Sequence, residues 1–178
     1  MSVDRVSTTS APARQASSEI LMDGLFTGML GALVVALWFL ILDLISGRPL
    51  YTPALLGTML LHGGAAAAGT ITIAPLEIAA YTAFHFITFV IVGTAFSWLM
   101  SLFDRFPIMF FVILVLAACL QIGFVAFSLA LHFEAPMRLG LWSVIVANLL
   151  AAAAMGIYQA RRHPGALKGV ERLWEHTD

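Results

Sequence analysis

Histidine, carboxylate and hydroxyl side chains recur inside an otherwise apolar stretch at 76–100. Glu77, Tyr81, His85 and Thr88 follow one another at spacings of three or four, which places them on one face of a helix. Ionisable groups inside an apolar helix are costly to bury and therefore indicate function. A histidine there can bind a haem iron, bind a metal or exchange a proton. His85, Tyr81 and Thr88 are thus candidate ligand-binding residues.

Other apolar stretches contribute isolated polar groups. Gln121 and Asn148 are further ligand-binding candidates, and their alternative role is a hydrogen bond between helices. Asp43 falls on the small-residue face of the first stretch and so points toward neighbouring helices, or it pairs with Arg48. His85 has a structural alternative too, as a neutral histidine bonded to Tyr81, Thr88 or Asn148.

A metal site is the weakest of the chemical hypotheses. His62, Glu77, His132 and Glu134 are the metal candidates, with Asp43 nearby, but they lack the spacing of a known metal motif. A haem held by His85 and His132 fits poorly, because the depths of these two residues differ by about 12 Å by helix rise. The cofactor is therefore unknown, with haem and metal both chemically open.

The elements that must position these residues are four long apolar runs. The sequence has 178 residues, of which 61% are hydrophobic and 11% charged. Each run has the roughly 20 residues that cross a hydrocarbon core, and lipid obliges each to be a helix. We therefore predict an all-α polytopic membrane protein, a four-transmembrane-helix bundle. Its transmembrane domain covers residues 21–162, with spans at about 24–46, 76–100, 107–132 and 139–160.

The connection at 47–75 is long enough to hold structure of its own. Thr52 and Pro53 are a good N-cap and first-turn pair, which predicts a short helix over 53–62 in the first outer loop. It is too short to span, so it is interfacial or re-entrant. The glycine and alanine residues at 63–69 predict a flexible loop.

Lysine and arginine residues predict the orientation. Seven lie in the tails and the 101–106 loop, against two on the other side, so both termini are expected in the cytoplasm. Residues 1–20 are expected to be a disordered tail, and 163–178 a short interfacial tail. The polar residues then collect in the outer halves of the spans. They predict a polar pocket open to the outside and closed by apolar inner halves.

Small residues at spacing four predict where the helices pack against one another. These packing candidates are Gly24, Gly28, Ala32 and Ala36 in the first span, with Ala152 and Gly156 in the fourth.

Residues 47–57, GRPLYTPALLG, resemble a stretch of uncharacterised small four-span bacterial membrane proteins. The resemblance implies a bacterial inner-membrane location. It implies no activity and no functional residues.

Three functions remain open at this point. The first is a non-enzymatic accessory subunit or assembly component of a membrane complex, which needs only packing faces. The second is a binder of haem, quinone, metal or a small ligand, and the third is a transport or proton-conducting component. No zinc-protease, nucleophile-elbow or phosphate-loop motif favours an enzyme. The expected partners are the bilayer and other proteins or further copies of the chain. A net charge of -1 argues against nucleic acid.

Overall fold

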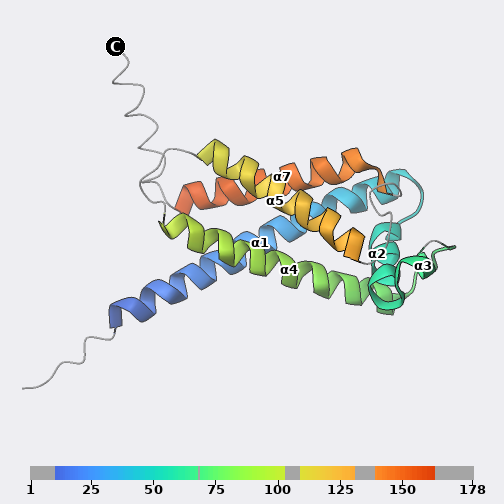
Figure 1. Cartoon of the computed structure of the whole chain (residues 1–178), viewed down its shortest axis with the longest axis horizontal. Coiled ribbons are helices and arrows are strands. Elements are labelled where there is room, and N and C mark those ends of the chain that lie inside the picture. The colour runs from blue at the N-terminus through green and yellow to red at the C-terminus, as the bar shows by residue number, and fades with distance from the viewer. Residues whose placement is uncertain (1–10, 68, 103–108, 131–138, 163–178) are drawn as a thin grey trace, which may run out of the picture.

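A computed structural model describes residues 11–67, 69–102, 109–130 and 139–162 of the chain, and in these ranges the predicted all-helical fold is confirmed. The helices are α1 (Ala11–Ile45), α2 (Tyr51–His62), α3 (Gly64–Ala67), α4 (Pro75–Leu102), α5 (Met109–Ala130) and α7 (Leu141–Arg162). The four long helices lie side by side, and α2 and α3 gather at one end of them (Figure 1).

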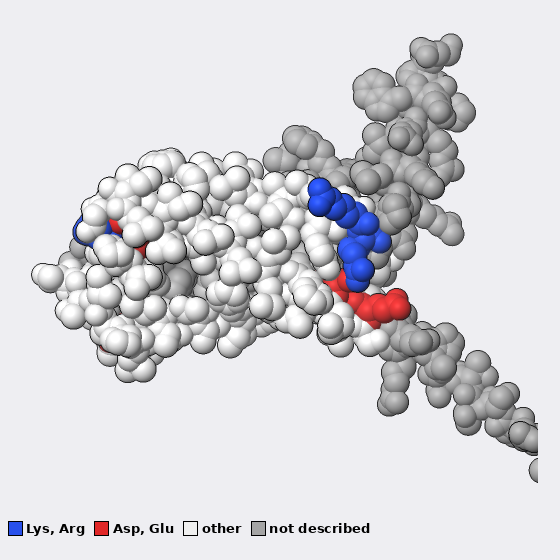
Figure 2. All heavy atoms as spheres, turned by 180° about the vertical axis from the view of Figure 1, so that it is seen from behind, with Lys and Arg blue, Asp and Glu red and all other residues white. Residues whose placement is uncertain are grey.

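The surface of these helices is that of a membrane protein. Three stretches in the described residues are long and apolar enough to cross a membrane: Ser18–Ile45, Pro75–Ser101 and Leu141–Arg162. A shorter apolar stretch, Val115–Ala126, lies in α5. On the face in Figure 2, charged side chains lie at the two ends and the middle carries none. A lipid bilayer is the environment that such a surface requires.

Glycines bring α1 and α4 into close antiparallel contact. A Cβ atom added to Gly93 of α4 would overlap the backbone of Gly24 and Gly28, and one added to Gly28 would overlap the backbone of Phe89. In lipid, such close backbone approach is a main source of helix association, because the hydrophobic effect does not act between helices there. The contact fixes α4, the helix that carries His85, against α1.

The small-residue face of α1 differs from the predicted one at its last member. Ala32 is fully buried, but Ala36 is exposed and Val35 takes the inward position with 7% of its surface accessible. The prediction for Ala36 is wrong because a helix has 3.6 residues per turn, so a spacing of exactly four drifts off the face. On α7, Ala152 and Gly156 are both buried.

Helix α7 is tied to α1 by polar contacts at both ends. The Trp38 indole N–H donates to the backbone carbonyl of Ser143 over 3.0 Å. At the opposite end, the Arg162 guanidinium donates to Asp23 over 2.6 Å. The two helices are therefore antiparallel, and the start of α1 lies beside the end of α7.

Two segments predicted to lack structure are helical. α1 begins at Ala11, so the tail prediction is wrong for residues 11–20, where alanine, arginine, glutamine and glutamate are all good helix formers. The predicted loop at 63–69 contains the short helix α3. Residues 1–10 and 163–178 lie outside the described ranges.

Candidate functional site

A cavity of about 230 Å³, here called the central cavity, lies among the long helices. Its walls come from α1, α4, α5 and α7, and α2 contributes Leu56. Among the ligand-binding candidates, Tyr81, His85, Thr88 and Asn148 line it. Most of the remaining wall is aromatic or aliphatic: Val35, Phe39, Phe84, Phe89, Val92, Leu120, Phe124, Leu139 and Val144.

His85 is held by α1 and by its own helix. Its Nε2 atom lies 3.2 Å from the backbone carbonyl oxygen of Ala32. Because a carbonyl oxygen only accepts, Nε2 carries the hydrogen and Nδ1 is the acceptor. The Tyr81 hydroxyl lies 3.5 Å from Nδ1, at the outer limit of a hydrogen bond, and the Phe89 ring packs 4.8 Å from the imidazole. His85 therefore serves as a neutral, oriented ring in the cavity wall.

This geometry disfavours His85 as a haem ligand. Nε2 is already directed at Ala32, and Nδ1 at Tyr81. An axial ligand needs a ring nitrogen with its lone pair directed at the iron.

Asn148 keeps hydrogen-bonding capacity inside the cavity. Its side-chain nitrogen donates to the Gln121 side-chain oxygen over 2.8 Å, which joins α7 to α5. An asparagine amide has two N–H donors and one oxygen acceptor, so this bond uses one of three groups. Gln121 is not among the lining residues, so it acts by holding Asn148 in place.

The central cavity differs from the predicted polar pocket. In the part of the chain that the structure describes, no Lys, Arg, Asp or Glu lines it, and Leu56 and Leu139 stand in its wall. The wall is more apolar than predicted because α2 packs against α4 and brings Leu56 to the cavity, and an opening toward the outside stays a prediction. Two charged groups near the α2 end, Asp43 and Glu77, are engaged elsewhere.

Asp43 fastens α2 to the end of α1. Its two carboxylate oxygens accept hydrogen bonds from the Thr52 backbone N–H over 2.7 Å and from the Thr52 hydroxyl over 2.8 Å. A carboxylate at the start of a helix also meets the positive end of the helix dipole. Arg48, the expected partner, instead stacks on the Tyr51 ring at 4.4 Å. Asp43 is therefore a structural residue, not a member of the cavity wall.

Asp43→Ala is expected to lower the stability of the fold by about 2 kcal/mol, because both bonds are to a buried charged acceptor. Thermal unfolding in detergent measures this loss. Thr52→Ser is the matched control, because it keeps both donors and removes only a methyl group. Equal melting temperatures for Asp43→Ala and the wild type would contradict this role.

The metal candidates in the described residues form one pair and gather no third ligand. His62 Nε2 lies 3.1 Å from Glu77 Oε1, which joins the end of α2 to the start of α4. No group of three or more His, Cys, Asp or Glu residues gathers in the part of the chain that the structure describes. His132 and Glu134 lie outside that part.

A buried polar cluster that the sequence reading missed joins α1, α4 and α7. We call Thr27, Ser97 and Gln159 the inner cluster, because it lies near the start of α1 and the end of α7. The fully buried Gln159 amide nitrogen donates to the Thr27 hydroxyl over 2.8 Å and to the Ser97 hydroxyl. Thr27 and Ser97 are therefore buried polar exceptions in halves of the first two spans that the sequence predicts to be almost purely apolar. A glutamine one residue before the end of the fourth run was the available signal.

Gln159→Leu is expected to lower the free energy of unfolding by about 1 kcal/mol or less. Interhelical hydrogen bonds in membranes contribute about 0.6 kcal/mol each on average. The Gln159 side-chain oxygen is buried without a partner among the described residues, and its removal offsets part of the loss. Gln159→Glu, in contrast, would bury a charge and destabilise the fold strongly. Chemical denaturation measures the free energy of unfolding of the two variants. A loss above about 3 kcal/mol for Gln159→Leu would contradict this prediction.

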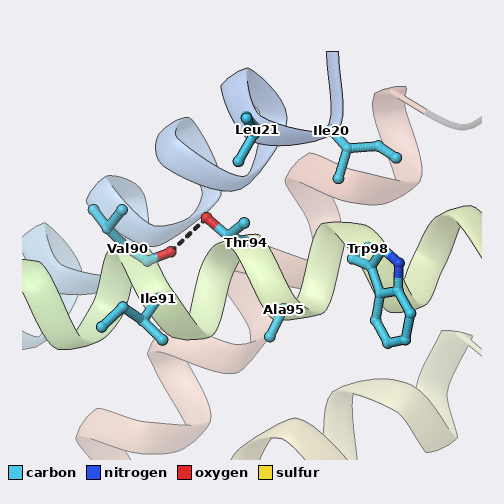
Figure 3. Close-up of a pocket in the computed structure, with 7 residues that line it drawn as sticks. All are labelled: Ile20, Leu21, Val90, Ile91, Thr94, Ala95 and Trp98. Atoms are coloured by element: carbon cyan, nitrogen blue, oxygen red, sulfur yellow. Dashed lines mark hydrogen bonds between the residues drawn. The ribbon is translucent and has the colours of Figure 1, made fainter. Parts of the chain in front are cut away.

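An open apolar groove runs along the outside of α1 and α4 (Figure 3). Ile20 and Leu21 form one side, and Thr94 is the polar member of the other. The Thr94 hydroxyl donates to the backbone carbonyl of Val90 over 2.8 Å, as Figure 3 marks. With its polar group satisfied and its walls apolar, the groove is a surface for lipid chains and offers no chemistry.

Comparisons with known proteins add no relative. No family model matches the chain, and searches of curated proteins and of solved structures find no match. The resemblance at residues 47–57 therefore stays a prediction.

Proposed function

We propose that this protein binds a small, uncharged, lipid-soluble molecule in the central cavity. The observation that carries the proposal is a wall of apolar side chains with a few neutral hydrogen-bonding groups, from His85, Tyr81 and Asn148. Ligand sites are commonly built in this way, from an apolar lining and a few placed polar groups.

The charge of the ligand follows from the lining. Since no Lys, Arg, Asp or Glu among the described residues lines the cavity, an ion inside it would have no counter-ion from that part of the chain. Moving an unpaired charge out of water costs many times more than moving a neutral hydroxyl or carbonyl group. A neutral head group with an oxygen atom is therefore the best fit, and a quinone or a long-chain alcohol meets this description.

The proposal includes a four-span topology in a bacterial inner membrane, with both termini in the cytoplasm. Helix α5 has 22 residues and a length of about 33 Å at 1.5 Å per residue, which is enough for a fourth span. In this arrangement α2 and α3 lie at the outer end. The excess of Lys and Arg in the tails and the 101–106 loop supports the orientation.

The accessory-subunit and transport hypotheses rest on the sequence alone. Both need helix-packing faces or a pathway, and Ala32, Ala152 and Gly156 are already used within the chain. The small-ligand hypothesis has in addition a cavity with a defined lining. It is therefore the function that we favour, as a non-enzymatic binding activity.

Thermal unfolding in nanodiscs of fixed lipid composition tests the proposal. Dodecanol, dodecanoate and dodecylammonium have the same chain length and differ in head-group charge. A molecule that binds only the native state raises the melting temperature. We expect a rise with dodecanol and none with the two ions. Equal shifts with all three would mean a general effect on the bilayer and would overturn the proposal.

A further inference from the structure

We infer that the central cavity opens sideways into the bilayer, between α4 and α5, so that its ligand comes from the membrane and not from water. The inference rests on the proposed function and specifies the source of the ligand. We call this opening the seam and define it by Thr88 on α4 with Cys119 and Gly123 on α5.

The first observation is exposure at the seam. Thr88, Cys119 and Gly123 line the cavity and are also exposed. A Cβ atom added to Gly123 would meet nothing within 4 Å, whereas one added to Gly93 would overlap a neighbouring backbone. Gly123 therefore faces open space, although it lies in the cavity wall.

The second observation is how the helices pair. α4 packs chiefly along α1 and α2, and α5 packs along α7. α4 and α5, which both line the cavity, pack less closely against each other than against these partners.

The third observation is the chemistry around the seam. Ile87 and Ile91 of α4 are 61% and 64% exposed, and Ile122 of α5 is 67% exposed. Such side chains face lipid in a membrane-spanning helix. At the α2 end, Leu56 and Leu139 contribute to the cavity wall. The surroundings of the seam are therefore those of a passage for lipid-soluble molecules.

The size of the cavity agrees with a ligand that lies partly in the seam. At about 230 Å³ it has the volume of about eight water molecules, each of which takes about 30 Å³ in the liquid. That space holds a head group or a short part of a chain. The rest of a long-chain molecule would extend through the seam into the surrounding lipid.

Photolabelling of the full chain in lipid vesicles tests the inference. One probe is a long-chain alcohol with a diazirine in its chain, which partitions into the bilayer. The other is a short, water-soluble alcohol with the same reactive group. We expect the bilayer probe to label Phe84 and Phe124 in the cavity wall, and the water-soluble probe to leave them unlabelled. Labelling of Ile87 and Ile91 by the bilayer probe shows that it has reached the protein.

Gly123→Leu provides the blocking variant. Leucine adds bulk where a side chain meets open space, and it favours the helix over glycine by about 1 kcal/mol, so folding is expected to survive. Labelling of the cavity wall should fall about tenfold, which corresponds to about 1.4 kcal/mol of lost binding. Ala118→Leu is the matched control, because Ala118 is exposed on α5 and is not part of the cavity wall.

Each outcome has a distinct meaning. Labelling of the cavity wall by the bilayer probe, blocked by Gly123→Leu alone, supports the seam. Labelling by the water-soluble probe alone would overturn the seam and leave the proposed function standing. If neither probe labels the cavity wall while Ile87 and Ile91 are labelled, both the seam and the proposed function are overturned.

Discussion

Gly93→Leu is expected to prevent stable folding, with a loss of about 3 kcal/mol or more. Its side chain would have to occupy the space of the α1 backbone at Gly24 and Gly28. A flexible side chain could move away at a modest cost, but two helix backbones can separate only by breaking the whole contact. Because that contact fixes α4 against α1, its loss also removes the His85 bond to Ala32.

Gly123→Leu is the natural comparison for this prediction. Both glycines lie inside apolar helices, and both changes add the same side chain. Only the side chain added at Gly93 would meet the backbone of a neighbouring helix, α1. Yield of monodisperse protein and thermal unfolding in detergent measure the difference. If the two variants were equally stable, the close α1–α4 contact described above would be contradicted.

The second large effect is expected at His85. His85→Leu should weaken the melting-temperature response to dodecanol about tenfold in apparent affinity, because the Tyr81 hydroxyl loses the Nδ1 acceptor that orients it and with it one hydrogen bond of about 1.4 kcal/mol to the ligand. The fold should lose about 1 kcal/mol, since the variant keeps apolar contact with Phe89 and loses the bond to Ala32. Unfolding curves with and without dodecanol separate the two effects.

His85→Gln is the matched variant for this experiment, because glutamine keeps a side-chain N–H donor and an acceptor in a neutral group. It should recover part of the dodecanol response. A stability loss that accounts for the whole change in dodecanol response would contradict a ligand-binding role for His85. The residue would then be only a structural link between α4 and α1.

The sequence was informative where one physical rule acts over a long stretch. Apolar length predicted the helices, and small residues predicted the surroundings of Gly24 and Gly28, because lipid imposes both constraints. The stripe of Tyr81, His85 and Thr88 also proved to share one cavity, because helix periodicity alone puts them on one face.

The sequence was misleading where the outcome depended on contacts between distant segments. Asp43 looked like a pocket residue, but the start of α2 offered its carboxylate two donors from Thr52. The path of α2 determines this, and no local pattern encodes that path. Likewise, the role of Gln159 depends on its hydrogen bonds to Ser97 and Thr27, which lie 62 and 132 positions away. The mainly apolar lining of the cavity also depends on which side chains of distant helices come together there.

Identifying the molecule that the central cavity holds is the most direct test of the proposed ligand binding. The protein, purified in nanodiscs made from its host membrane, is extracted with organic solvent and analysed by mass spectrometry. We expect the extract to contain one class of uncharged lipid-soluble molecule, at about one molecule per chain, as for one ligand-binding pocket. The same class should remain with Ala118→Leu and be missing from Gly123→Leu. Identical extracts from the wild type and Gly123→Leu, matching the bulk lipid, would contradict the account.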